Sequence, residues 1–425
     1  MRRGLCVIVA SLLCISLLSG CMGKVTSDTV KDRTVIHLWH PLTGGDGDYF
    51  NEIVKQFNAS NQKYVVKVSV FKWDDYNAKL ANGIAADAGP DLAVARNSFY
   101  QFLRTKDMTL ELSNVARSVG IPWDEYNPLA LSVVKEGDKY YGSPLDTHPV
   151  VMFYNKDILA KAGVLDAQGQ PEFESTEEGF RAFLDKIAKV MPAGQYPIAL
   201  PTYAKSAEQW YLWYTWYAQN GGKGLFNSDM SAPGINKAAF LKSASFEQSL
   251  YAKPYIQPND TDFTQTFISG RAAICFTGVW ATSKFMNQLP SLGAVAIPNL
   301  WNDQQIYYAG THVLVIPSSV KDPQHQEGAA TFMKYFNEHD LKWAEAGHVP
   351  VNMKVWTQTD YLSMPFRSLY TDIAQKVQYV EPQKDVFGLY ENLLSPGLEM
   401  IWRGTLTPEE GYRKITSDLQ FYLDY

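Results

Sequence analysis

The sequence predicts an α/β protein built from two lobes, and three observations support this. At 425 residues the chain is longer than most single domains, so two lobes are expected. Strand-like and helix-like patterns alternate from Thr34 onward, which favours parallel sheets covered by helices. Gly142-Ser143-Pro144 interrupts the alternation before it resumes at Val150, which places a crossing between the lobes near 142–149. A ligand is then expected between the lobes.

The first lobe begins with a strand–helix–strand–helix–strand order. Residues 34–39 are rich in β-branched side chains and predict a strand, and the glycine-rich stretch after them predicts a loop. Asp46 or Asp48 is available to cap the following helix. The apolar positions of that helix recur at helical spacing, at Phe50, Ile53, Val54 and Phe57. Further strands are predicted at 64–71 and 92–95, with a helix over 74–86 between them.

The rest of the chain continues this alternation. Ser175-Thr176-Glu177-Glu178 has the pattern of a capping box and predicts that a helix begins there. The other predicted elements are strands at 150–154, 197–201, 272–276 and 313–316, helices at 208–218 and 323–338, and a helical C-terminal third. The expected N-terminal lobe is 33–145 with about 306–340, and the expected C-terminal lobe is 146–305 with about 341–425.

Composition and charge exclude several classes of protein. Lys and Arg number 38 against 44 Asp and Glu, a net charge of −6, which argues against a nucleic-acid-binding protein. Trp, Tyr and Phe are abundant, at 11, 25 and 21 residues. Aromatic rings fill cores, but Trp and Tyr also suit a pocket of flat faces with polar edges.

The N-terminus is predicted to be an export signal. Arg2 and Arg3 precede an uncharged apolar run, 5–18, which is shorter than the roughly 20 residues of a membrane-spanning helix. Leu18-Ser19-Gly20-Cys21 follows and resembles the bacterial lipobox, in which the cysteine carries lipid. We therefore expect 1–20 to be a lipoprotein signal peptide, Cys21 to be lipidated and 21–32 to be a polar tether. The alternative is an ordinary signal peptide that happens to precede a cysteine.

No catalytic or metal-binding motif stands out. The sequence contains no Walker A motif, no H-E-x-x-H, no C-x-x-C and no G-x-S-x-G, so we expect no catalytic residue, metal or cofactor. With Cys6 and Cys14 inside the signal and Cys21 lipidated, only Cys275 remains, and its apolar surroundings predict a buried side chain. The 44 carboxylates leave a glycosidase pair open.

Six segments together resemble one known family. They are Ile36-His37-Leu38-Trp39-His40, Gly89-Pro90-Asp91-Leu92, Tyr140-Tyr141-Gly142-Ser143-Pro144, Phe153-Tyr154-Asn155-Lys156-Asp157, the block from Phe267 to Trp280, and Gly347-His348-Val349-Pro350-Val351. In this order they resemble the extracellular solute-binding proteins of bacterial ABC sugar importers, of the maltose-binding-protein-like type. Arg271 and Ile274 depart from the usual Lys and Met.

The resemblance implies a two-lobed periplasmic-binding-protein type II-like fold with a hinge and an interlobe ligand cleft. It also implies a lipid-anchored, extracytoplasmic, monomeric binding subunit without enzymatic activity. Such a protein captures a mono- or oligosaccharide and delivers it to the permease subunits, which are served by separate ATPase subunits.

Candidate ligand residues follow from the predicted strand ends. Gly278 ends a strand and Trp280 opens a helix, so backbone N–H groups and an indole face converge there. Trp39 and His40 end the first strand at its carboxyl edge, where α/β proteins collect ligands. Asp91 is expected in a turn, with hydroxyl binding as the second option. Arg96, Asn97 and Ser98 follow a strand at the rim of the cleft, and Asn97 is the best ligand candidate of the three.

The crossings and the aromatic-rich helix supply the remaining candidates. Asp146, with Thr147 and His148, lies on the first crossing, where it is placed to accept sugar hydroxyls. Gly310 and His312 lie on the predicted return crossing. One residue of 203–217 is expected to contact ligand, with Tyr203 and Trp213 as candidates, although a helical aromatic stripe usually forms core. Trp343 is placed either in the cleft wall or under the turn at Gly347.

Other functions remain open from the sequence. A surface glycosidase or polysaccharide lyase would share the aromatic cleft, and an adhesive lipoprotein would share the anchor. A binding protein for a polyamine or a glycerophosphodiester would differ only in its loops. Arg96 is the only evident cation for a phosphate ester.

Overall fold

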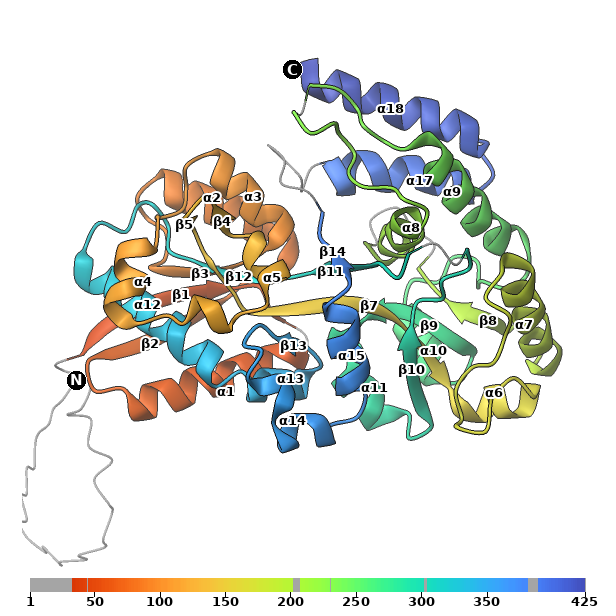
Figure 1. The fold of residues 1–425 in the computed structure, drawn as a ribbon, viewed down its shortest axis with the longest axis horizontal. Coiled ribbons are helices and arrows are strands. Elements are labelled where there is room, and N and C mark those ends of the chain that lie inside the picture. The colour runs from red at the N-terminus through yellow and green to blue at the C-terminus, as the bar shows by residue number, and fades with distance from the viewer. Residues whose placement is uncertain are drawn as a thin grey trace, which may run out of the picture.

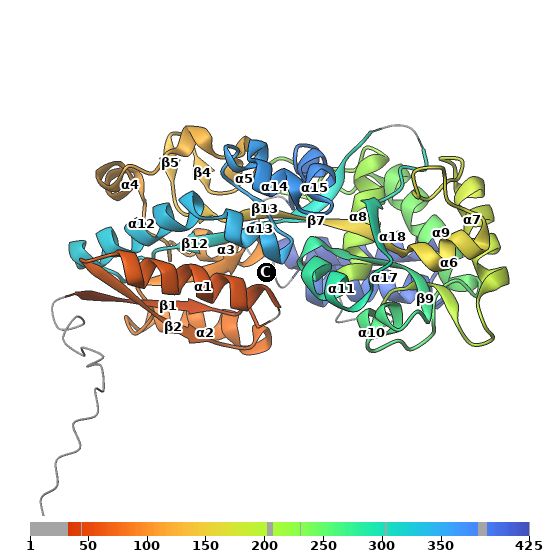
Figure 2. The same cartoon turned by 90° about the horizontal axis from the view of Figure 1, so that it is seen from below.

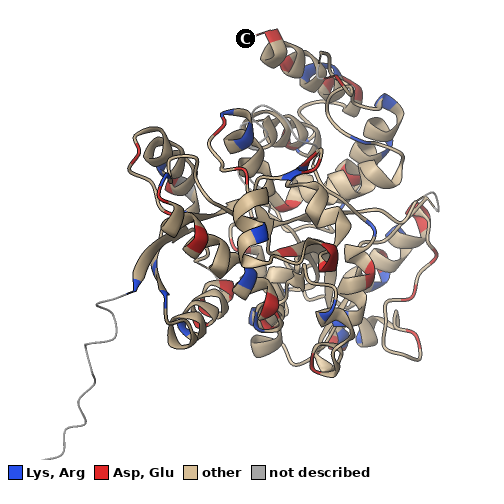
Figure 3. Ribbon diagram, turned by 60° about the vertical axis from the view of Figure 1, so that its left-hand side comes forward, with Lys and Arg blue, Asp and Glu red and all other residues tan. Residues whose placement is uncertain are grey.

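The computed structural model describes residues 33–43, 45–201, 207–229, 231–301, 304–380 and 389–424. The predicted signal peptide and tether, with Cys21, lie outside the described residues, and so does Tyr203. Two lobes lie side by side, each with its own sheet (Figures 1 and 2). Basic and acidic residues are interspersed over both lobes (Figure 3). Among the described residues, no helix is long and apolar enough to cross a membrane.

The N-terminal lobe contains a five-stranded sheet in the order β2-β1-β3-β12-β6. Its strands are β1 (Thr34–His40), β2 (Tyr64–Val70), β3 (Leu92–Arg96), β6 (Ser143–Pro144) and β12 (His312–Val315). Strands β2, β1 and β3 are parallel, as the alternating pattern predicts, and β12 is antiparallel to β3. The return strand β12 thus comes from a segment that is distant in sequence from the other strands of this sheet.

Helices cover both faces of this sheet, because alternate residues of β3 point to opposite sides. Leu92 and Val94 pack in a core with α1 (Gly45–Ser60) and α12 (Pro323–Glu338). Ala93 and Ala95 pack in a second core with α2 (Trp73–Ala85) and α3 (Asn97–Thr105). The smaller elements of this lobe are α4 (Ser113–Val119), η2 (Trp123–Glu125), α5 (Pro128–Ser132), β4 (Lys135–Glu136) and β5 (Lys139–Tyr140).

The C-terminal lobe is organised around β7 (Asp146–Asn155), a strand buried along its whole length. The sheet runs β14-β11-β7-β9-β8, and β10 and β13 also pair with β7. These strands are β8 (Tyr196–Ala199), β9 (Ala272–Gly278), β10 (Leu292–Ala296), β11 (Tyr307–Gly310), β13 (Val349–Pro350) and β14 (Val377–Gln378). Cys275 is fully buried in β9, as predicted.

One large core joins this sheet to its helices. The remaining helices of the described residues are α6 (Lys156–Ala162), α7 (Glu177–Val190), α8 (Ala207–Gln219), α9 (Lys237–Ala252), α10 (Phe263–Ile268), η3 (Val279–Ala281), α11 (Thr282–Gln288), α13 (Leu341–Ala346), η4 (Val355–Thr357), α14 (Thr359–Ser363), α15 (Arg367–Ala374), the π-helical turn η5 (Tyr390–Leu394), α17 (Ser395–Trp402) and α18 (Pro408–Asp424).

The chain passes between the sheets at two adjacent points. Leu145 joins β6 of the first sheet to β7 of the second, and Thr311 joins β11 back to β12. The two crossings are tied together, since the Thr311 hydroxyl donates a 2.6 Å hydrogen bond to the Asp146 carbonyl oxygen. A third connection follows α12. Here Trp343, Ala346 and Val351 pack in the N-terminal core, whereas Val349 belongs to β13, which pairs with β7 of the second sheet.

Two expectations about helix starts need correction. Helix α1 already begins at Gly45, so Asp46 and Asp48 lie inside its first turn and do not cap it. There their negative charges interact favourably with the positive end of the helix dipole. Thr176 caps α7 by accepting a hydrogen bond from the Gly179 N–H. The third helical position is therefore a glycine, and the reciprocal half of a capping box is missing.

Candidate functional site

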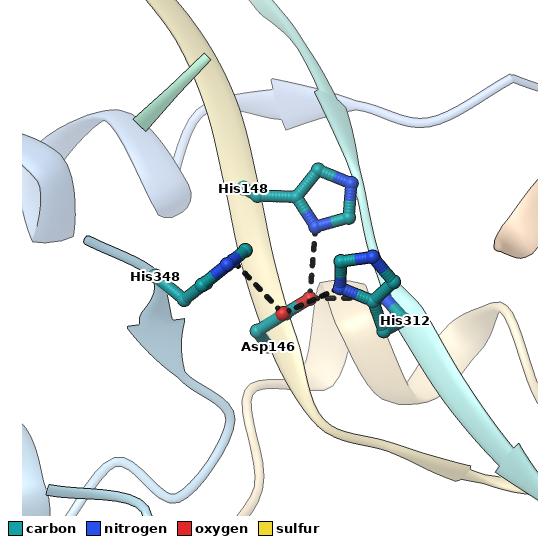
Figure 4. Close-up of side chains that lie close together, drawn as sticks. All are labelled: Asp146, His148, His312 and His348. Atoms are coloured by element: carbon teal, nitrogen blue, oxygen red, sulfur yellow. Dashed lines mark hydrogen bonds and ion pairs between the residues drawn. The ribbon is translucent and has the colours of Figure 1, made fainter. Parts of the chain in front are cut away.

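Asp146 is the centre of a buried polar cluster at the lobe crossing. It is the first residue of β7 and is fully buried. Its Oδ1 accepts hydrogen bonds from His148 Nδ1 at 2.9 Å and from the His312 backbone N–H at 2.9 Å. Its Oδ2 accepts from His312 Nδ1 and from Trp343 Nε1, both at 2.8 Å. Figure 4 shows the imidazoles of His148, His312 and His348 arranged around this one carboxylate.

The donors outweigh the cost of burying the Asp146 charge. Burial alone raises the pKa of a carboxyl group, but the neighbouring His312, His148 and His348 hold the pKa of Asp146 well below its usual range. An ionised carboxylate only accepts hydrogen bonds, so His148 and His312 donate from Nδ1. Burial lowers the pKa of His148 to about 4, against the attraction of Asp146, so this imidazole is neutral at pH 7.

His348 is the cationic member of the cluster. Burial lowers its pKa, but the charge of Asp146 and its contact with Asp46 raise the pKa to about 9. Its Nδ1 lies 3.0 Å from Asp146 Oδ2, and its Nε2 lies 3.9 Å from Asp46 Oδ2. The ring stacks on Trp343 with centroids 4.2 Å apart and planes 5° apart. The cluster therefore pairs one buried carboxylate with one imidazolium at neutral pH.

Gly310 makes room for His148. The two residues are directly opposite each other in the antiparallel pair of β11 and β7. A Cβ atom at position 310 would clash with His148 Nε2, so the imidazole can lie there only against glycine. Gly310 was expected to let a ligand approach the backbone closely. In this structure the group that lies against its backbone is the His148 imidazole.

Trp280 contributes an aromatic face from the C-terminal lobe. As expected, β9 ends at Gly278 and a helical turn, η3, starts at Val279. The Trp280 indole folds back over Gly278, where any Cβ would clash with the ring. Its ring centre lies 5.6 Å from that of His148 in an edge arrangement and 6.4 Å from that of Tyr211. Trp280 is only partly buried, so one part of the indole remains accessible.

Trp73 and Arg96 contribute a second aromatic and cationic face, from the N-terminal lobe. The Arg96 guanidinium lies 3.6 Å from the centre of the Trp73 ring. That ring is nearly parallel to His312, at 29°, with centres 6.4 Å apart. Arg96 was expected at the rim of the cleft, whereas the predicted ligand residues did not include Trp73. Its position just after β2, at the carboxyl edge of a parallel sheet, is the signal that could have found it.

Several other predicted ligand residues adjoin the cluster. Asn97 begins α3, is 5% exposed, and its backbone N–H donates to the Thr311 carbonyl oxygen at 2.9 Å. Trp343 is fully buried in the N-terminal core and contacts the cluster through its indole N–H and through its ring, which stacks on His348. The structure therefore places Trp343 beneath the turn at Gly347, which was the second of the two expected positions.

Trp39, His40 and Asp91 do not join the cluster. The Trp39 ring packs on Phe71 and over Gly83 of α2. His40 is fully buried, and its Nδ1 accepts the Leu42 N–H, so it caps a loop. Burial lowers the pKa of His40 to about 4.

Asp91 precedes β3 and therefore lies at the opposite edge of the sheet from Arg96. It accepts hydrogen bonds from His325 Nδ1 and the His37 N–H, which is the turn role that was expected first.

Trp213 lies in the core of the C-terminal lobe. It is fully buried, stacks on Tyr217 with centres 4.9 Å apart, and packs edge-on against Phe240. Residues 209–219 of helix α8 are all buried, so the aromatic spacing of this helix reflects packing in the core. Tyr211, two residues earlier, is the member of this helix that reaches Trp280.

A pocket of about 920 Å³ lies between the lobes. Phe102 of α3 and Lys106, the residue after α3, line it from the N-terminal lobe, and η5, α17 and α18 line it from the C-terminal lobe. Helix α3 begins at Asn97 beside Thr311, so the same helix contacts the crossing at its start and this pocket farther along.

Comparisons with known proteins agree with this architecture. The family profile of the bacterial extracellular solute-binding proteins matches residues 52–361. The arabinooligosaccharide-binding protein of Bacillus subtilis (strain 168) is 24% identical over 387 residues, which are 88% of this chain and 85% of that protein.

Two solved structures show the same fold. The GacH receptor of Streptomyces glaucescens, determined unliganded and with acarbose, is 15% identical with a TM-score of 0.80 over 92% of this chain and 99% of that chain. UgpB from Mycobacterium tuberculosis, in complex with glycerophosphocholine, is 16% identical with a TM-score of 0.79 over 92% and 99%. Since the family profile covers most of the chain, from within α1 to α14, the protein belongs to the bacterial extracellular solute-binding proteins.

Proposed function

We propose that this protein is the substrate-binding subunit of an ABC importer and captures a neutral oligosaccharide between its lobes. One observation carries the proposal. Trp280 of the C-terminal lobe and Trp73 of the N-terminal lobe flank two histidines that a shared carboxylate holds in place. Sugars present C–H-rich ring faces and hydroxyl groups, and this arrangement offers aromatic faces and oriented ring nitrogens to match them.

The position of the cluster explains how binding would close the lobes. Asp146 and His312 lie on the two strands that pass between the sheets, while Trp73 and Trp280 lie on different lobes. A ligand that contacts both tryptophans gains contacts only when the lobes approach, so it favours the closed form. The closed form is then the one that docks on the permease. The 920 Å³ pocket along α3 leaves space for further sugar units.

The relatives support capture without chemistry. The Bacillus subtilis relative is an arabinooligosaccharide-binding protein, and the GacH receptor has been determined in complex with acarbose. We assign the cluster of Asp146 and the three histidines to ligand binding without catalysis, because its four polar side chains orient one another. A lipid on Cys21 holds the monomeric body at the outer face of the membrane, where the permease lies.

A glycerophosphodiester is the second candidate ligand. Arg96 places a guanidinium beside His312 and Trp73, and such a group binds phosphate well. The structural likeness to a glycerophosphocholine-bound protein supports the same alternative. The aromatic faces serve either ligand, so a direct comparison is needed.

The test is a melting-temperature screen of residues 23–425 against mono- and oligosaccharides and glycerophosphodiesters. A ligand at one hundred times its Kd stabilises the folded chain by roughly 2.7 kcal/mol, a shift of a few degrees. We expect a saturable shift from an oligosaccharide that is recovered intact. If only phosphodiesters shift the melting temperature, the ligand is a glycerophosphodiester and not a sugar. Cleavage of the sugar would indicate an enzyme.

Two variants sharpen this test. Trp280→Ala is expected to lose at least tenfold in sugar affinity while folding normally. Trp123→Ala is the matched control, since Trp123 is also partly buried but stacks on Tyr140 inside the N-terminal lobe. Equal affinity in the two variants would remove Trp280 from the site. For the anchor, Cys21→Ser is expected to release the protein from membranes.

A further inference from the structure

The cluster at the lobe crossing has the composition of a transition-metal site. We propose that Asp146, His148, His312 and His348 together bind one divalent metal ion, with Zn²⁺ as the ion that best matches the donors. Imidazole nitrogen and carboxylate oxygen are ordinary zinc ligands, and a closed set of four protein ligands is typical of structural zinc. The proposal concerns a ligand other than the transported solute and stands independently of the sugar.

The ligand atoms of the four side chains lie close enough to bind one ion once the side chains move toward it. One ligand atom from each of the four residues lies within 4.8 Å of all the others. The three Nδ1 atoms are 2.8, 2.9 and 3.0 Å from the Asp146 oxygens. With bonds of roughly 2.0–2.1 Å, the donors of a tetrahedral zinc site are about 3.3 Å apart. The imidazoles therefore need to move from the carboxylate by a few tenths of an ångström. The ligand atoms that lie farthest apart, at up to 4.8 Å, need to approach each other by roughly 1.5 Å.

His348 supplies a second, independent indication. It is fully buried, and among the described residues neither ring nitrogen has a hydrogen-bond partner of good geometry. The Nδ1 atom lies at ion-pair distance from Asp146, yet its direction is not that of a hydrogen bond. Buried imidazoles normally satisfy their nitrogens, and a metal ion in the cluster would satisfy this one.

The surrounding groups resemble the outer support that metal ligands have in proteins. Trp343 Nε1 and the His312 backbone N–H hold the Asp146 carboxylate in one orientation. Asp46 faces the outer nitrogen of His348 at 3.9 Å, as carboxylates commonly face metal-bound histidines. With the ion bound, the metal would balance the buried charge of Asp146.

The proposed ion would join three separate segments. The ligands come from the start of β7, the start of β12 and the residue before β13. These segments meet where the chain passes between the lobes, so metal binding would stabilise the crossing itself. Because unfolding disperses residues 146, 312 and 348, the ion binds the folded chain and raises its melting temperature.

The experiment uses residues 23–425 treated with a chelator, dialysed and titrated with ZnCl₂ alone, without sugar. We expect one equivalent by calorimetry and by elemental analysis, and a rise in melting temperature. Co²⁺ in place of Zn²⁺ should give the visible absorption of a four-coordinate nitrogen and oxygen site. This spectrum needs no variant and therefore does not depend on a substitution being tolerated.

Variants locate the site. His348→Ala and, separately, His148→Gln are expected to weaken Zn²⁺ binding by about 100-fold or more. His339→Ala is the control, because His339 lies on the exposed end of α12 and should leave binding unchanged. The proposal is overturned if the wild-type chain binds no equivalent of Zn²⁺ or Co²⁺, or if binding survives both cluster substitutions. Sugar binding is measured separately, so either proposal can fail alone.

Discussion

Asp146 and Glu247 are both fully buried carboxylates, yet their surroundings are opposite. Asp146, at the lobe crossing, accepts hydrogen bonds from two imidazoles, an indole and a backbone N–H, and pairs with His348. Glu247, on α9 in the C-terminal core, has no hydrogen-bond partner for either oxygen within the described part of the chain. The pKa of Asp146 is held well below its usual range, and burial raises the pKa of Glu247 well above its own.

The comparison shows that burial fixes the cost of a charge, while the neighbours decide whether the charge remains. The partners of Asp146 come from strands and turns far apart in sequence, and they assemble only when both lobes have folded. Glu247 has no such hydrogen-bond donors among the described residues, and burial favours its neutral form. The following substitutions test this contrast.

The largest effect is expected at Asp146. Asp146→Asn removes the negative charge, leaves the His348 imidazolium buried and turns an amide N–H toward the imidazole donors. Breaking a buried charge pair on one side costs about 3–5 kcal/mol. Urea unfolding at pH 7 with a chelator present measures this loss. A change below about 1 kcal/mol would show that the cluster contributes little and that the contrast with Glu247 is wrong.

A smaller effect is expected at Gly310, because the contacts of Asp146 depend on where His148 lies. Gly310→Ala places a methyl group against His148 Nε2 and pushes the ring off the carboxylate. Overpacking of this kind costs about 1–3 kcal/mol. Gly45→Ala is the control, since a Cβ there meets no atom within 4 Å. Equal unfolding free energies for the two variants would mean that His148 moves without cost.

The third effect is a pH dependence of the free energy of unfolding that Glu247 causes. Its usual pKa is 4.5, and the folded pKa is raised, so above pH 4.5 the unfolded chain releases a proton that the folded chain keeps. The free energy of unfolding therefore falls as pH rises in this window, by about 1.4 kcal/mol per pH unit for this one group. Glu247→Gln removes the loss, so the variant should be more stable than the wild type at pH 7.

Unfolding curves at pH 5, 6 and 7 compare the wild type, Glu247→Gln and the exposed control Glu178→Gln, whose side chain is 85% exposed. The difference in unfolding free energy between the wild type and Glu247→Gln should increase as the pH rises. A difference that stays constant would mean that Glu247 is ionised in the folded chain and has a partner.

Local patterns determined much of the fold. Helix α12 has the bounds that were expected, and β1, β3 and β9 differ from their predicted bounds by one or two residues at one end. The β-branched alternation, Pro323 at the helix start and the glycine at the end of β9 act within a few residues, so they are visible in the sequence. The same reasoning placed Asp146 and His312 on the crossings and Trp280 at its strand end.

Only the tertiary structure decided which side chains meet. His348 joins the cluster across 202 residues from Asp146, and Trp73 faces His312 from another segment of the N-terminal lobe. His40 and Trp213 carry suitable chemistry but point into loops and core. Sequence patterns report the period of a helix or strand, whereas the neighbours of a side chain follow from how two lobes pack and cross. That packing depends on contacts between residues far apart in the chain, which no local pattern records.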